Sequence, residues 1–117
     1  MSGTDAHIAK AERLLGSFRE IGAEHAELRV VALYYSALHL ASAVAAGSGL
    51  VFPSHRQLHS WLKAEHPAVW EHYSPLLQAS LEARYNVGPL RIGADGLERV
   101  LHKTHYRRVR DWSEECT

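Results

Sequence analysis

Apolar residues recur every three or four positions along most of the chain, which is the spacing of amphipathic helices. The first such stretch runs from Ile8 to Ile21, and Ser2, Thr4 and Asp5 offer N-caps just before it. A second helix is expected to begin near Ala23. Its centre, residues 30–46, is apolar nearly all round, as in a helix that has others packed on several sides.

Polar residues interrupt that apolar centre and argue against a membrane span; they are Ser36, His39 and Ser42. Residues 47–53, rich in glycine and ending in proline, break the helix. Ser54 and Gln57 then have the S-x-x-Q spacing of a capping box, which predicts a third helix from about His55 to Ala64.

Two prolines punctuate the next segment. Pro67 and Pro75 each suit the first turn of a helix, where a missing N–H costs nothing, so we expect separate helices near residues 68–73 and 75–86. Residues 86–93 form a turn-rich loop. Asp95 and Glu98 predict another capping box ahead of a last helix with apolar positions from Leu97 to Trp112.

The fold class follows from these elements. The chain shows no alternating apolar and polar run that would indicate a strand, and no internal repeat. We therefore predict an all-α protein, an up-and-down bundle of four long helices plus a short one. Residues 1–117 are expected to form a single domain, with a core from about residue 5 to residue 112.

The composition of the chain predicts a cellular location but does not indicate a substrate. The 117 residues are 46% hydrophobic and 22% charged, the balance of one ordinary globular domain that needs no metal or disulfide to hold it together. The single cysteine, Cys116, excludes an intrachain disulfide, which favours an intracellular location. The N-terminus has no signal-peptide pattern, so we expect a cytoplasmic protein without membrane contact.

Thirteen basic and thirteen acidic residues give a formal net charge of zero, which argues against a uniformly basic, duplex-binding surface. The charges are uneven, because residues 84–110 hold seven basic residues against two acidic ones. Within that segment a stripe on the last helix is a candidate RNA-contact surface; it comprises Arg99, Lys103, Tyr106, Arg107 and Arg110. A solvated helix face is the alternative interpretation of the stripe.

Three motifs carry a resemblance. They are Tyr34-Tyr35-x-x-x-His39, then Ser54-His55-x-x-Leu58, then Ser80-Leu-Glu-Ala-Arg84-Tyr85. In this order the chain resembles small bacterial and archaeal HEPN domains over about residues 5–112. The resemblance implies a helical bundle, commonly dimeric, that is associated with RNA cleavage, RNA binding, toxin–antitoxin pairs and antiviral defence.

The family's ribonucleases carry an arginine followed after four to six residues by a histidine. A histidine can move the proton of a ribose 2′-hydroxyl while an arginine neutralises charge on the phosphate, without a metal. Arg84 best matches the family's arginine, but no histidine follows it at that spacing. Arg99 and His105 have the spacing, yet on one helix their side chains are expected to point about 120° apart.

The candidate catalytic residues are therefore Arg84, His39, His55, Arg99 and His105. Tyr34, Tyr35 and Tyr85 are expected to complete a shared polar pocket if the second, third and fifth helices pack as they do in the family. Two alternatives stay open. Arg84 can cap the end of its helix, and His39 can be a hydrogen-bonded core histidine.

Metal and cofactor sites are not expected. His55 and His59, and His102 and His105, have spacings that can clamp zinc, but no third ligand is apparent, so surface or capping histidines are favoured. No phosphate-binding glycine loop is present.

Three tryptophans, Trp61, Trp70 and Trp112, can exceed what one small bundle covers, which predicts a homodimer; core packing of all three is the alternative. The leading functional hypothesis is a dimeric, RNA-associated or defence-type binding or regulatory module. The alternatives are a metal-independent endoribonuclease acting on single-stranded RNA, and a structural subunit that binds a protein partner encoded nearby.

Overall fold

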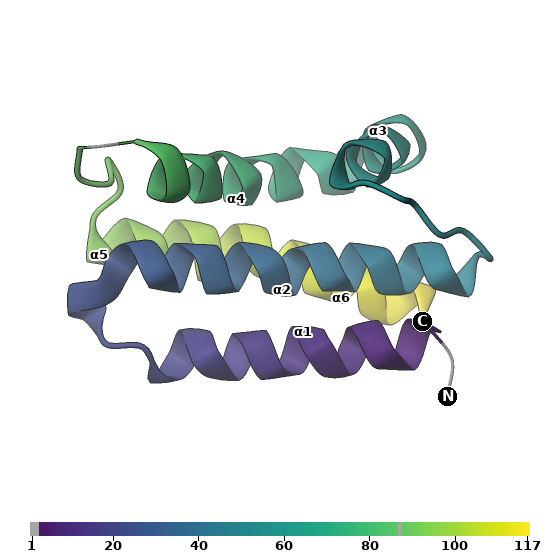
Figure 1. Cartoon of the computed structure of the whole chain (residues 1–117), viewed down its shortest axis with the longest axis horizontal. Helices are drawn as coiled ribbons and strands as arrows, with labels where there is room; N and C mark the ends of the chain where they lie inside the picture. Colours follow the sequence, from purple (N-terminus) through teal and green to yellow (C-terminus); the bar gives the residue numbers. More distant parts are fainter. Residues whose placement is uncertain (1–2, 87) are drawn as a thin grey trace.

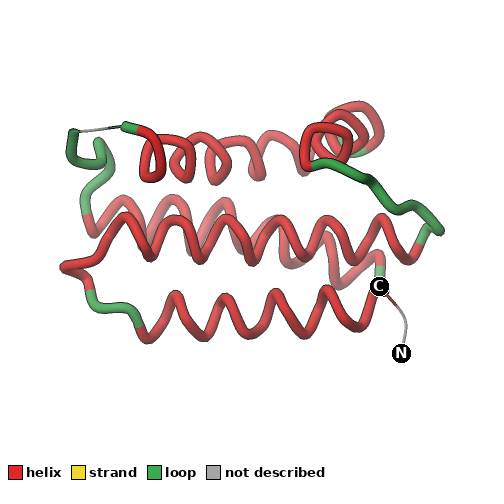
Figure 2. The backbone as a smooth tube through the Cα atoms, viewed as in Figure 1, coloured by secondary structure: helices red, strands yellow, loops and turns green. Residues whose placement is uncertain are grey.

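The computed structural model describes residues 3–86 and 88–117, which contain helices and no strand. The elements are α1 (Gly3–Glu20), η1 (Ala23–His25), α2 (Ala26–Gly47), α3 (His55–Glu65), α4 (Pro67–Tyr85), α5 (Ala94–Gly96), η2 (Leu97–Tyr106) and α6 (Arg107–Cys116). The last three follow one another directly and make one long helix. Figures 1 and 2 show α1, α2, α4 and this last helix lying alongside one another, with the short α3 at one end. The all-α bundle predicted from periodicity is confirmed.

Helix α2 is the axis of the bundle. In Figure 1 it lies between α1 and α4, with the last helix packed alongside. Leu33, Ala37 and Ala41 are fully buried on it, which explains why its sequence is apolar nearly all round. The segment Ala23–Gly47 is long and apolar enough to cross a membrane, but 67% of its most apolar stretch is buried inside the bundle, as in a core helix.

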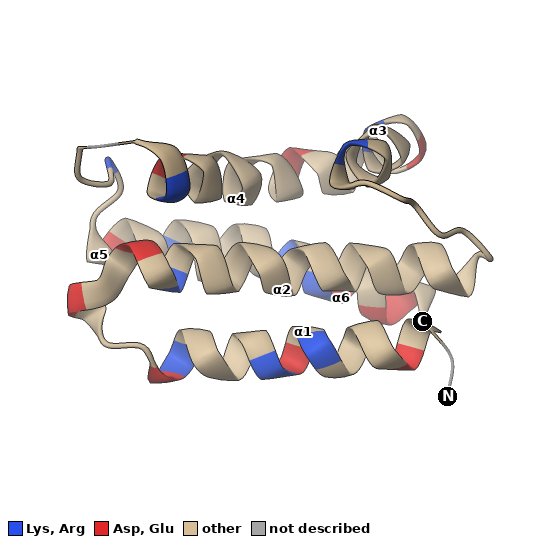
Figure 3. Ribbon diagram, viewed as in Figure 1, with Lys and Arg blue, Asp and Glu red and all other residues tan. Residues whose placement is uncertain are grey.

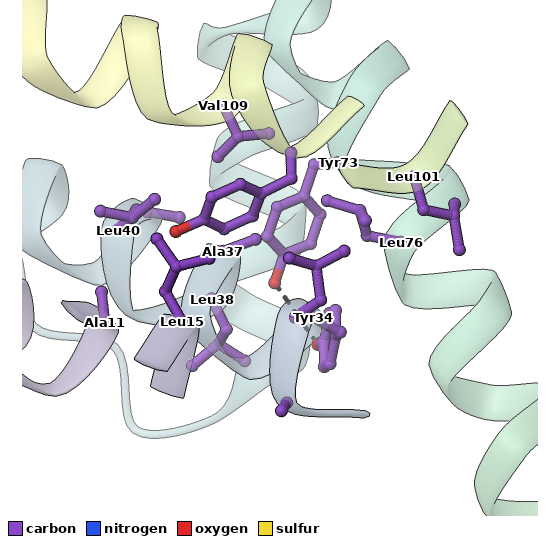
Figure 4. Packing of buried hydrophobic residues seen from close by; sticks show 14 of the residues in the cluster. Ala11, Leu15, Tyr34, Ala37, Leu38, Leu40, Tyr73, Leu76, Leu101 and Val109 are labelled. Carbon is purple, nitrogen blue, oxygen red and sulfur yellow. Dashed lines mark hydrogen bonds between the residues drawn. The ribbon is translucent and has the colours of Figure 1, made fainter. Parts of the chain in front are cut away.

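Helix α4 corrects one prediction. It is a single helix from Pro67 to Tyr85, with Pro75 inside it, instead of two helices separated at Ser74. An interior proline costs about 3 kcal/mol because it removes a hydrogen bond and crowds the preceding turn. Tyr73 and Leu76, on either side of the proline, are both buried in the core (Figure 4), and their burial offsets that cost.

The last helix corrects another prediction. Its central ten residues, Leu97–Tyr106, form a π-helix, in which the Thr104 hydroxyl donates to the Arg99 carbonyl oxygen five residues earlier, at 2.9 Å. Its buried residues, Leu97, Leu101 and Tyr106, are four and five positions apart, which suits the wider turn of a π-helix.

The capping box expected at its start is absent. The N-cap of α5 is Gly93, with no side-chain hydrogen bond; Asp95 instead accepts from Arg99 and Glu98 contacts His102. Each acidic side chain thus contacts the side chain four residues later on the same helix, the spacing at which helical neighbours meet.

The ends of the other helices match the sequence more closely. The Ser54 hydroxyl accepts a hydrogen bond from the Gln57 amide at 3.2 Å, which confirms that N-cap. Thr4 lies inside α1 instead of capping it, and its hydroxyl donates to the Ala43 carbonyl oxygen; Ser2 lies outside the described residues. Helix α2 ends in a Schellman turn, in which Gly49 has a φ of 78° and the Leu50 amide donates to the Ala45 carbonyl oxygen at 2.9 Å.

Candidate functional site

A pocket of about 470 Å³ opens between α2, α3 and α4. Three cationic side chains line it, together with two histidines and a mostly apolar wall. Its lining residues are Tyr34, His55, Arg56, His59, Ser60, Lys63, Trp70, Leu77, Leu81 and Arg84. None of these residues is acidic, so the pocket suits an anionic ligand that also has an apolar or aromatic part. We call it the cationic pocket.

Helical spacing brings these residues to one place. On α3, His55, His59 and Lys63 are four residues apart and therefore share a face. On α4, Trp70, Leu77, Leu81 and Arg84 are separated by seven, four and three residues, which also places them on one face. The two faces meet over Tyr34 of α2.

Arg84 is held in place by several contacts. Its Nε donates to the hydroxyl of Ser80 at 3.1 Å and to the Ser80 carbonyl oxygen at 3.3 Å, while Nη1 donates to the Tyr35 hydroxyl at 3.3 Å. The guanidinium carbon lies 5.9, 5.6 and 5.3 Å from the ring centres of Tyr34, Tyr35 and Tyr85, within cation–π range. Arg84 therefore both bonds a carbonyl near the end of its helix and presents a fixed charge at the pocket.

A compact group of polar atoms lies beneath that charge. The Nε2 of His59 is 2.8 Å from the Tyr73 hydroxyl and 3.2 Å from the Tyr34 hydroxyl, and Tyr73 donates to Tyr34 at 3.3 Å (Figure 4). Burial, and then the nearby His55, lower the pKa of His59 to about 4. Burial also raises the pKa of Tyr34, and raises that of Tyr73 well above its usual value. At neutral pH all three side chains are uncharged.

The positive charge at this pocket is not neutralised by the protein. Arg56, Lys63 and Arg84 form no ion pair within residues 3–86 and 88–117. Elsewhere both signs of charge are interspersed along the helices (Figure 3). Arg99, for example, lies 2.8 Å from Asp95, and Arg110 lies 3.0 Å from Glu12.

Most of the polar cluster expected from the resemblance comes together. Tyr34, Tyr35, His55 and Arg84 surround one region, with the rings of Tyr35 and His55 at 6.3 Å, and the 70% exposed Tyr85 lies beside Arg84. His39 does not share the cationic pocket. It lines a smaller neighbouring pocket, where its Nδ1 lies 2.9 Å from the Nδ1 of His7. Of the residues that the structure describes, only His55 lines both pockets.

Arg99 and His105 are not brought together as a pair. Arg99 is exposed and engaged with Asp95, whereas His105 points toward α4, its Nδ1 lying 3.0 Å from that of His72. The wider turn of the π-helix keeps residues six apart on different sides, as expected for an α-helix too.

The stripe on the last helix also needs correction. Lys103 and Arg107 are exposed, but Tyr106 is only 2% exposed and its hydroxyl lies 2.7 Å from that of Ser36. Because Tyr106 packs in the core, it cannot stack on a base. Tyr106 lies on the same buried side of the helix as Leu97 and Leu101, so its side chain points into the core.

The three tryptophans pack within the bundle. Trp70 stacks on Tyr73, while Trp61 and Trp112 lie against the ring of His66. All three are partly buried against the core. Among the described residues, the exposed large apolar side chains are Leu28, Leu50, Val51, Tyr85 and Val100.

Sequence reasoning missed several lining residues. His59 is half-buried and bonded to tyrosines, not a surface or capping histidine. Tyr73, Arg56 and Lys63 were not singled out, and Trp70 was considered only for a dimer contact or for core packing. The signal for the α3 residues was present, since a histidine and a lysine recur four and eight positions after His55. Over the described ranges, no group of three or more histidine, cysteine or acidic side chains is arranged to hold a metal ion.

No protein-family model, curated protein or solved structure matches the chain.

Proposed function

We propose that the protein is a HEPN-like, RNA-associated binding or regulatory module that acts as a dimer and holds single-stranded RNA at the cationic pocket. One observation carries the proposal: three cations without acidic partners converge with aromatic rings on one pocket. RNA phosphates supply the complementary charge. Unpaired bases supply flat faces that stack on aromatic side chains and arginine planes.

The assignment of parts follows from geometry. Arg84, fixed by Ser80 and Tyr35, is the primary phosphate contact, because its orientation costs no further ordering when a ligand arrives. Arg56 and Lys63 on α3 contact neighbouring phosphates along the strand. Trp70 offers the largest aromatic surface in the pocket for a base.

The test is equilibrium binding of a fluorescently labelled single-stranded RNA at low salt, in the presence of a chelator. We expect Arg84→Ala to weaken binding by at least about tenfold, the loss of one charge-assisted contact. Arg19→Ala is the matched control, since Arg19 is an exposed cation on α1, on the side of α2 away from α4 (Figure 1). Equal affinity of the two variants, or no binding at all, would contradict the proposal.

Metal-independent RNA cleavage is the second candidate, and one observation favours it: His55 lines the same pocket as Arg84. In this candidate function, His55 of α3 takes the role of the histidine that is missing after Arg84 in the sequence. In the reaction, His55 takes the proton of a ribose 2′-hydroxyl and the 2′-oxygen bonds to phosphorus, while the P–O5′ bond breaks and the leaving 5′-oxygen takes a proton from water. Arg84 stabilises the charge on the phosphoryl oxygens.

The same RNA incubated in chelator tests this candidate. Cleavage should leave cyclic phosphate ends, stop when the 2′-hydroxyl is removed, and be lost in both His55→Ala and Arg84→Ala. Intact RNA after prolonged incubation with protein that binds it leaves the binding module as the function. Absence of both binding and cleavage would favour a structural subunit for a protein partner.

The dimer is part of the proposal. The three tryptophans give it little support, because their side chains pack against the core of one bundle and do not form an exposed apolar patch. Sedimentation equilibrium over a range of concentrations is the direct check, and a mass of one chain at all of them would remove the dimer from the proposal.

A further inference from the structure

The two helices that wall the cationic pocket contribute different chemistry. On α4, the side chains of Trp70, Leu77 and Leu81 share one face, and each is half-buried, so that part of it remains accessible from the pocket. On α3, the exposed Arg56 and Lys63 line the same pocket. The pocket therefore has an apolar wall on α4 and a cationic wall on α3.

Arg84 and Trp70 lie at the two ends of the α4 wall. They are 14 residues apart on one helix, which separates their backbones by about 21 Å. A row of tyrosine rings connects their side chains. The guanidinium carbon lies 5.9 Å from the Tyr34 ring, the Tyr34 ring 5.7 Å from that of Tyr73, and the Tyr73 ring 5.8 Å from that of Trp70. The guanidinium and the indole are therefore at most about 18 Å apart.

This separation matches a short piece of single strand. A nucleotide adds about 3.4 Å of length in a stacked strand and roughly twice that in an extended one. Two or three extended nucleotides therefore reach from a phosphate on Arg84 to a base on Trp70. In a mononucleotide the phosphate and the base are only about one such step apart, which is too short for both contacts.

The indole of Trp70 is already held in position for stacking. It packs on the Tyr73 ring at an interplanar angle of 23° and lies 5.8 Å from the ring of His59. Tyr73 is fully buried, and its hydroxyl lies 2.8 Å from the Nε2 of His59, so the group behind the indole is fixed. A base that stacks on Trp70 meets a surface that needs little further ordering.

We infer that the cationic pocket binds two or three nucleotides of a single strand, with phosphates on Arg84 and the α3 cations and with one base stacked on Trp70. The inference rests on the proposed function and adds a requirement to it, because the ligand must present an unpaired base as well as its phosphates. A strand that lacks this base keeps its charge contacts and loses the stacking contact.

The length of strand that the pocket holds can be measured. Uridylates of one, two, three and six nucleotides, each with a 5′-phosphate, are titrated into the ¹⁵N-labelled protein at low salt. We expect affinity to rise at least about tenfold from one nucleotide to three, the yield of a further charge-assisted contact and a stacked base, and to level off between three and six.

The outcomes separate this inference from the proposed function. Equal affinity of the mononucleotide and the trinucleotide, or a rise that continues unchanged to six nucleotides, would overturn the inference and leave RNA binding in place. No binding at any length would remove the proposed function, and the inference with it.

Removal of single bases distinguishes stacking from charge. An abasic residue is placed in turn at each position of the trinucleotide, which leaves every phosphate in place. We expect one position at which affinity falls at least about fivefold, the smallest loss typical of a stacked base. If no position shows a loss, binding depends on charge alone and the inference is wrong.

Two variants attach the stacked base to Trp70. Trp70→Leu keeps an apolar side chain but removes the aromatic face, so the intact trinucleotide should bind at least about fivefold more weakly and the abasic change should cause no further loss. Trp61→Leu is the matched control, because Trp61 is also partly buried against the core but does not line the cationic pocket. An equal loss in both variants would overturn the Trp70 contact.

The wild-type protein provides a second readout if Trp70→Leu does not fold. The indole Nε1–H resonances of the three tryptophans report on each ring separately. The intact trinucleotide should shift the resonance of Trp70 more than those of Trp61 and Trp112, which lie outside the cationic pocket. An unmoved Trp70 resonance at saturating trinucleotide would overturn the assignment.

Discussion

The Nε of Arg84 lies 3.1 Å from the hydroxyl of Ser80, one helical turn earlier on α4. Ser80 is fully buried, so its hydroxyl has a fixed position and fixes the base of the guanidinium in turn. Tyr35 then accepts from Nη1. An exposed arginine normally samples many rotamers, but this one is oriented across the tyrosine rings at the mouth of the cationic pocket.

Removing the Ser80 hydroxyl should weaken RNA binding without removing any charge. We expect Ser80→Ala to lower affinity about three- to tenfold, less than Arg84→Ala, because the guanidinium stays but loses one of its anchors. Fluorescence anisotropy with the same labelled RNA gives the comparison. Ser113→Ala is the control: Ser113, like Ser80, is a buried serine on a helix, but it lies on α6, where its hydroxyl donates to the Arg110 carbonyl oxygen. An equal loss of affinity in Ser113→Ala would mean that the effect reflects stability.

The salt dependence of RNA binding should identify which cations contact phosphates. For single strands, log affinity falls against log salt with a slope of about −0.7 per neutralised phosphate. Arg56→Ala and Lys63→Ala should each make the slope shallower by about that amount. Arg99→Ala should not, because Arg99 is already paired with Asp95. A shallower slope for Arg99→Ala, with no change for the α3 variants, would move the RNA contact to the last helix.

Much of the fold could be predicted because helix periodicity is a local signal. The helix break expected at Pro75 was wrong because it also relied on a local signal, a proline that suits a helix start. The helix continues through Pro75 because Tyr73 and Leu76 are buried against other elements, and sequence spacing does not show those contacts. The π-helix was not predicted either. Its hydrogen-bond register differs from an α-helix by one residue, a difference that apolar spacing does not resolve.

The candidate site was predicted only in part. Tyr35 and Arg84 are 49 residues apart, and their contact depends on how α2 and α4 pack, which only the resemblance suggested. His59 was assigned to the surface because its spacing from His55 was considered for metal binding alone. Tyr106 was placed on the cationic stripe, because a tyrosine between basic residues gives no local sign that its hydroxyl meets Ser36 in the core.

Tyr106→Phe should destabilise the bundle and leave RNA binding unchanged. The Tyr106 hydroxyl lies 2.7 Å from Ser36, whose own hydroxyl donates to the Ala11 carbonyl oxygen at 2.8 Å, so the contact joins the last helix to α2 and α1. Loss of a buried hydrogen bond costs about 1–2 kcal/mol of unfolding free energy. Thermal denaturation should show a lower Tm, by about 4 °C for a domain of this size. An unchanged Tm would contradict the structural role, and weakened RNA binding would return Tyr106 to the interface.

Stability should fall as the pH is lowered from about 7 toward 5. The pKa values of His39 and His59 are lowered from 6.5 to about 4 in the folded protein, mainly by burial. Between these values the unfolded chain binds protons at both histidines and the folded chain does not, so acid favours unfolding. The contribution of these two histidines to the unfolding free energy is therefore fully present above pH 6.5, and it decreases continuously as the pH falls toward 4.

Urea denaturation at pH 7.5, 6.5, 5.5 and 5.0 measures this dependence before most carboxylates titrate. We expect the unfolding free energy to decrease with a slope to which His39 and His59 together contribute nearly two protons per molecule near pH 5. His39→Phe and His59→Phe should each remove about one proton from the slope. A flat wild-type profile, or an undiminished slope in both buried-histidine variants, would show that these rings accept protons in the folded state as readily as in the unfolded one.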